Sequence, residues 1–151
     1  MARAILLGGL VVGILDGLDA AIFWTLRGSS ADRVFRAIAS GLLGPSAVQA
    51  GTGTALLGVA LHFLIATGAA AVFVLASRRL PVLLRYAVPA GMVYGLGVHV
   101  FMQYVVIPLS AFAGRRGSPS GVVLANLLLA HAFLVGLPIA LIARAVLGRP
   151  R

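Results

Sequence analysis

The stretch AILLGGLVVGILDGLDAAIFW, residues 4–24, decides the fold class of this chain. It is apolar except for Asp16 and Asp19, which are two of only three acidic residues in the sequence. A helix of about 20 apolar residues crosses the ~30 Å hydrocarbon core of a bilayer, so this stretch is predicted to span a membrane. A charge at the bilayer centre costs at least ~2.5–3.5 kcal/mol. The two carboxylates therefore predict polar partners inside a helical bundle.

The composition supports a membrane protein over its whole length. Of 151 residues, 61% are hydrophobic and only 10% are charged, and the mean hydropathy is +1.09. A soluble domain carries roughly 25% charged residues, so this chain could not cover a surface that faces water. We predict an all-α membrane protein with a single membrane domain and four spans, at about 4–24, 54–76, 86–107 and 122–143.

The connections between the spans differ in length. The segment SRRLP (77–81) predicts a tight charged turn, and GRRGSPSG (114–121) predicts a loop rich in helix breakers. The first connection is longer and contains a predicted amphipathic helix at about 31–43, which Gly44-Pro45 ends. Its apolar stripe is predicted to be Val34, Ile38 and Leu42, and such a helix is typical of the membrane surface.

The positive charge is carried entirely by arginine. The formal net charge is +9, with twelve arginines and no lysine, mostly at the edges of apolar runs. They lack the interleaved aromatic residues of a nucleic-acid surface, so anionic lipids are the expected partners and nucleic acid is not. The composition is also compatible with a homo-oligomer or a larger membrane complex.

Cysteine is absent, which excludes disulfides, thiolate metal ligands and covalently attached c-type haem.

The arginines also predict the orientation, because four spans place both termini on one side. That side carries seven: Arg3, Arg78, Arg79, Arg85, Arg144, Arg149 and Arg151. The other side carries five: Arg27, Arg33, Arg36, Arg115 and Arg116. The positive-inside rule therefore favours cytoplasmic termini by a small margin.

The buried polar residues are predicted to lie in one layer. At a rise of 1.5 Å per residue, Asp16, His62 and His99 each lie about 12 Å from the non-cytoplasmic end of their helix, and His131 lies about 13.5 Å from it. Small residues at every fourth position on or beside these faces predict close helix packing. The candidate intramembrane polar or ion site is therefore Asp16, Asp19, His62, His99, Gln103 and His131.

This layer has several interpretations, of which catalysis inside the membrane is the least favoured, because the sequence shows no convincing serine–histidine or paired-carboxylate constellation. The side chains could hydrogen-bond across helices and set the packing, with Asp16 to His62 as the first pair. They could equally conduct a proton or an ion. The alternative is a metal- or haem-binding membrane protein, such as an accessory subunit of a redox complex. Its metal ligands would be His62, His99, His131 and Asp16, or two histidines would hold a haem.

Three segments carry a resemblance: LHFLIATGAAAVFVLASRRLP (61–81), FMQYVVIPLSA (101–111) and HAFLVGLPIAL (131–141). The chain resembles a group of small four-span bacterial membrane proteins with no established activity, and it is more distantly similar in layout to the YagU-type inner-membrane family. The resemblance implies a bacterial inner-membrane location and a four-helix fold. His62 and His131 match histidines of this pattern, whereas His99 is not clearly matched.

Overall fold

The computed structural model describes residues 1–112, 119 and 121–148, and every regular element among them is helical. Four helical stretches are long and apolar enough to cross a membrane, which confirms the predicted number of spans. The first is α1 (Ala2–Thr25) and the second is α3 (Thr52–Arg79). The third comprises α5 (Ala87–Phe101), the π-helical turn η2 (Met102–Val106) and α6 (Ile107–Leu109). The fourth comprises α7 (Gly121–Ala130), the π-helical turn η3 (His131–Gly136) and α8 (Leu137–Leu147).

The charged turn after the second span begins later than predicted. Helix α3 continues through Arg78 and Arg79, which lie in its last turn, where cations interact favourably with the helix dipole. It ends at Arg79, because Leu80 precedes Pro81 and the residue before a proline is disfavoured in the helical conformation. The short helix α4 (Val82–Arg85) then leads into the third span and was not predicted. Most of the predicted 114–121 loop lies outside the described residues.

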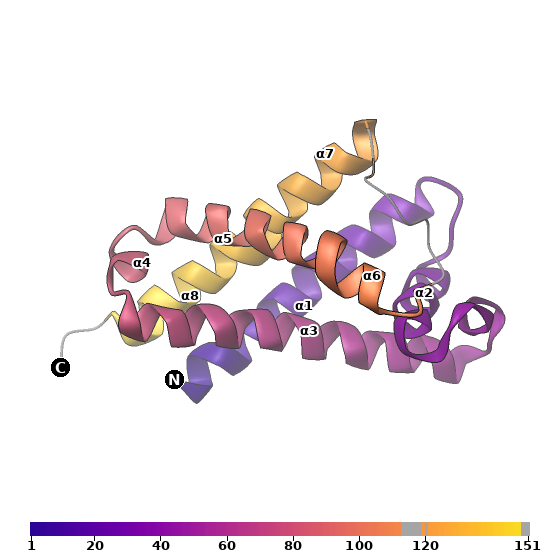
Figure 1. The fold of residues 1–151 in the computed structure, drawn as a ribbon, viewed down its shortest axis with the longest axis horizontal. Helices are drawn as coiled ribbons and strands as arrows, with labels where there is room; N and C mark the ends of the chain where they lie inside the picture. The colour runs from indigo at the N-terminus through magenta and orange to yellow at the C-terminus, as the bar shows by residue number, and fades with distance from the viewer. Residues whose placement is uncertain (113–118, 120, 149–151) are drawn as a thin grey trace.

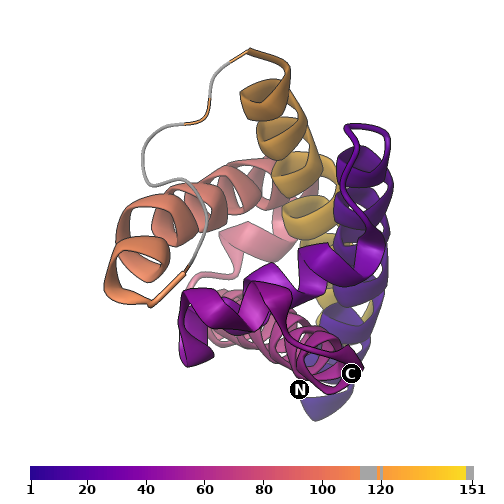
Figure 2. The same ribbon diagram turned by 90° about the vertical axis from the view of Figure 1, so that its right-hand side faces the viewer.

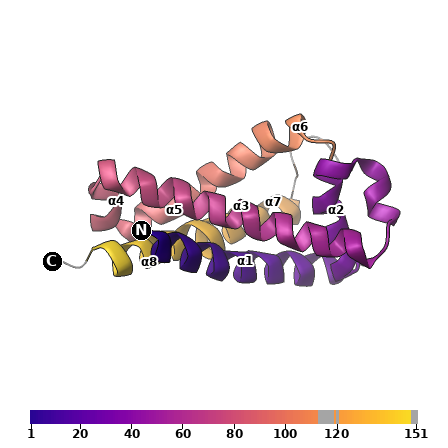
Figure 3. The same cartoon turned by 90° about the horizontal axis from the view of Figure 1, so that it is seen from below.

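The spans pack as two pairs joined through the first and the last helix. Helix α1 packs along α3, the third span packs along the fourth, and α1 also contacts α8 (Figure 1). The largest fully buried apolar side chains are Val12, Phe73, Val74 and Ile139. The start of α1 and the end of α8 lie at the same end of the bundle (Figure 3), as an even number of spans requires.

Helix α2 (Ala31–Leu43) forms in the first connection and lies across the other end of the bundle (Figure 2). It packs mainly on α3. Gly58 of α3 permits this contact, since a Cβ there would overlap the backbone carbonyl of Phe35. Of the predicted apolar stripe, Val34 and Ile38 are half-buried and Leu42 is 66% exposed, while the neighbouring Ala39 is fully buried.

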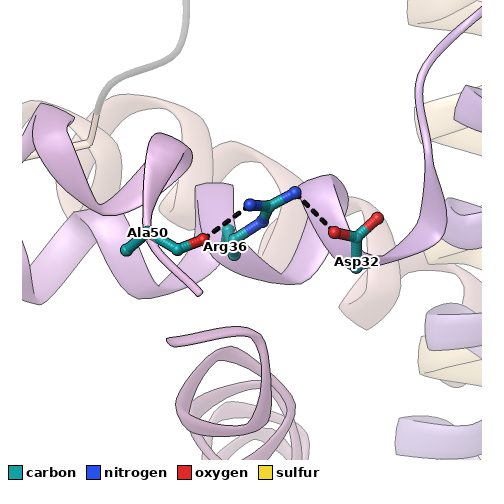
Figure 4. A network of polar contacts seen from close by, with 3 residues as sticks. All are labelled: Asp32, Arg36 and Ala50. Carbon is teal, nitrogen blue, oxygen red and sulfur yellow. Dashed lines mark hydrogen bonds and ion pairs between the residues drawn. The ribbon is translucent and has the colours of Figure 1, made fainter. Parts of the chain in front are cut away.

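Arg36 holds the turn that follows α2. Its Nη1 donates a hydrogen bond of 2.6 Å to the carbonyl of Ala50, just beyond the 3₁₀ turn η1 (Pro45–Gln49), and its Nη2 pairs with Asp32 (Figure 4). A hydrogen bond from Ser30 and the nearby charge of Arg36 lower the pKa of the Asp32 carboxyl. The Asp32 carboxylate is therefore ionised at neutral pH, and its ion pair with Arg36 joins the first and second turns of α2.

Candidate functional site

A cavity of about 640 Å³ lies between the spans. It extends from Trp24, Ile38 and Phe112 at the α2 end to Val12 and Val135 in the interior. Five of the six predicted site residues line it: Asp16, His62, His99, Gln103 and His131. All four spans contribute to this lining. Asp19 is the exception among the six.

His62 connects the second span to the first. Its Nε2 lies 3.0 Å from the carbonyl oxygen of Gly13. A carbonyl only accepts, so Nε2 carries the proton of the neutral ring and Nδ1 has the lone pair. Phe35 of α2 packs edge-on against the ring, with centroids 6.1 Å apart. The expected hydrogen bond to Asp16 is thus replaced by one to the α1 backbone, although both side chains line the cavity.

His99 and His131 form a pair between the third and fourth spans. Their ring centroids are 5.1 Å apart and the ring planes meet at 73°. His131 Nδ1 lies 2.8 Å from the carbonyl of Leu127, which assigns the proton of the neutral ring to Nδ1 and the lone pair to Nε2. His99 is only 7% exposed. The two imidazoles are therefore in direct contact beside the cavity.

Two π-helical turns lie next to this pair, and a proline explains each. Pro108 and Pro138 have no N–H, so the carbonyl four residues earlier in each span loses its α-helical partner. The wider turns η2 and η3 occur immediately before these prolines, and they contain Gln103 and His131 respectively. Such turns are frequent at functional sites because they alter the direction of the side chains that they carry.

Asp19 has its hydrogen-bond partner on the fourth span. Asn126 Nδ2 of α7 donates a hydrogen bond of 2.9 Å to its carboxylate. This bond joins the first and fourth spans outside the lining of the cavity. Asp16, by contrast, forms no hydrogen bond with any residue that the structure describes. The two aspartates therefore have different surroundings although they are three residues apart.

The structure does not bring together the ligands of the alternative metal site. Within the described parts of the chain, no three histidine or acidic side chains are grouped closely enough to hold one metal ion. The set of Asp16 with the three histidines thus shares a cavity without forming a ligand cluster.

Two haem ligands must lie on opposite faces of the porphyrin. The direct ring contact between His99 and His131 leaves no room for a porphyrin between them.

Three features of the site were not found by reasoning from the sequence. Trp24, at the end of the first predicted span, lines the cavity. Asn126 bonds Asp19, and the carbonyl of Gly13 bonds His62. Gly13 belongs to a row of small residues in α1, and this row was the available indication that a backbone carbonyl would be accessible to another helix.

No family model, curated protein or solved structure matches the chain.

Proposed function

We propose that this polytopic membrane protein is non-enzymatic and exchanges protons at the polar cavity inside its bundle. The observation that carries the proposal is the cavity itself, because Asp16, Gln103 and all three histidines of the chain line it. Ionisable groups inside a membrane are costly, and they commonly mark proton or ion pathways. Imidazole is the side chain that ordinarily titrates near neutral pH, which suits it to proton exchange.

The hydrogen bonds divide these groups into two roles. The bonds from His62 to Gly13 and from Asn126 to Asp19 connect different spans, so they support a role in setting the bundle. Within the described residues, Asp16 and His99 make no hydrogen bond that would explain their presence structurally. We therefore assign proton exchange to Asp16 and the contacting pair His99 and His131.

Proton flux into liposomes that contain a trapped pH-sensitive dye tests this function. We expect the reconstituted protein to collapse a pH gradient faster than empty liposomes do. Asp16→Asn preserves size but removes the charge, so flux should fall to the background rate. Asp19→Asn is the matched control, because its partner Asn126 lies away from the cavity, and flux should be largely retained. Background flux in the wild type, or full flux in Asp16→Asn, would refute the assignment.

We further propose that α2 lies at the membrane surface on the non-cytoplasmic side. It crosses the end of the bundle opposite the start of α1 (Figure 2), and its exposed side includes Asp32 and Arg33. Arg27 stacks over Phe23 nearby, with the guanidinium carbon 5.2 Å from the ring centroid. Arginine beside an aromatic ring is typical of the level of the lipid head groups.

The bacterial inner-membrane location is part of this proposal and rests on the family resemblance. The cytoplasmic placement of both termini rests on the seven-to-five distribution of arginines. At the end proposed to be cytoplasmic, Arg85 lies over Tyr86, with the guanidinium carbon 5.4 Å from the ring centroid. Anionic head groups are the partners that these arginines are proposed to bind.

A further inference from the structure

The cavity is larger than a path for protons requires. Its volume of about 640 Å³ lies within the ~300–1,000 Å³ range of pockets that hold small organic molecules. Most of its wall is apolar and comes from different spans, with Ile65 and Ala66 from α3, Val98 from α5 and Leu127 from α7. A ligand that fills this space therefore needs an apolar body.

The polar groups of the wall define the charge of such a ligand. The proton-bearing nitrogens of His62 and His131 are already bonded to backbone carbonyls. In the neutral rings, the remaining nitrogens are hydrogen-bond acceptors, and the carboxylate of Asp16 also only accepts. No arginine among the described residues lines the cavity. The lining also includes N–H donors, among them those of Gln103 and Trp24, so its distinguishing feature is the single formal negative charge of the described lining residues, at Asp16.

We propose that the cavity binds a monovalent organic ammonium compound, with its N–H donors at Asp16 and its apolar body against the aliphatic wall. This inference deepens the proposed function, on which its site rests, by making the amine the competitor of the proton. One lining carboxylate balances one positive charge. The Asp19 carboxylate lies outside the lining and accepts a hydrogen bond from Asn126, so it does not contact a ligand in the cavity.

Competition with protons sets the direction of the pH dependence. The titratable groups around Asp16 are Asp19 on its own helix, His62 from α3, His99 from α5 and His131 from η3. Protonation of a histidine adds a repelling positive charge, and protonation of Asp16 removes the attracting negative one. Binding of the ammonium compound should therefore weaken as the pH falls.

Trp24 supplies a built-in probe, since it is the only tryptophan of the chain and lines the cavity. Phenethylamine is titrated into the purified full-length protein in detergent while tryptophan fluorescence is recorded. We expect a saturable change in fluorescence. The affinity for phenethylamine that it reports should rise between about pH 5 and 8, where imidazole ordinarily titrates and this amine stays protonated. Asp16→Asn should weaken binding roughly tenfold or more, whereas Asp19→Asn should bind nearly as the wild type does.

Two analogues complete the test, one neutral and one anionic. Phenethyl alcohol and phenylacetate should give no saturable change, because neither carries the ammonium group. Equal binding of the alcohol, unchanged affinity in Asp16→Asn, or only a linear response from detergent partitioning would each overturn the inference. Amine binding without proton flux would refute the proposed proton exchange alone. Proton flux without amine binding would refute this inference alone.

Discussion

At the scale of single residues, glycine decides how closely the third and fourth spans approach. A Cβ on Gly95 would overlap the carbonyl of His131 and lie 3.0 Å from the nitrogen of Gly136. Gly95→Ala should therefore push η3 away from α5 and cost about 1–3 kcal/mol, the usual cost of overpacking. The measurement is thermal unfolding of the purified protein in detergent, which should show a lower Tm.

Gly97 is the matched control for this change, because it lies in the same helix and a Cβ added to it would meet no neighbouring atom within 4 Å. Gly97→Ala should leave the Tm nearly unchanged. If both variants unfolded at the wild-type temperature, the close contact between α5 and η3 would be wrong, and so would the position of His131 beside His99.

At the scale of elements, the close approach of Gly58 to the backbone of Phe35 sets the distance between α2 and α3. A Cβ on Gly58 would overlap the carbonyl of Phe35, so Gly58→Ala should displace α2 from α3. Phe35 also packs on His62, and its displacement should expose the end of the cavity. We expect faster proteolysis between Arg27 and Pro45 in the variant than in the wild type.

Gly68 lies in the same helix and has no neighbour within 4 Å of a Cβ, so Gly68→Ala is the matched control and should be cleaved at the wild-type rate. Equal rates of cleavage for the wild type and Gly58→Ala would contradict the packing of α2 on α3. Arg36 and its bonds to Asp32 and Ala50 should remain in both variants, because these contacts lie within the α2 segment and its following turn.

At the scale of the whole molecule, the even number of spans places the start of α1 and the end of α8 at one end of the bundle. With seven arginines on that side against five, both termini are predicted to be cytoplasmic. A reporter fused after Arg151 should be active in the cytoplasm, and one inserted within 114–121 should be active on the other side. Mixed activity at both positions would instead indicate insertion in both orientations.

The number of helices long and apolar enough to cross a membrane follows from the sequence alone, and the sequence also predicts the depth of the polar residues. Both are one-dimensional properties, because the bilayer sets the length of an apolar run and the helical rise converts position into depth. The hydrogen-bond partners of these residues, in contrast, follow from how the helices pack. His62 bonds the carbonyl of Gly13 instead of Asp16, and Asp19 bonds Asn126. The rotation of each helix, and hence the partner that each side chain meets, depends on packing between residues far apart in the chain, which a single helical pattern does not contain.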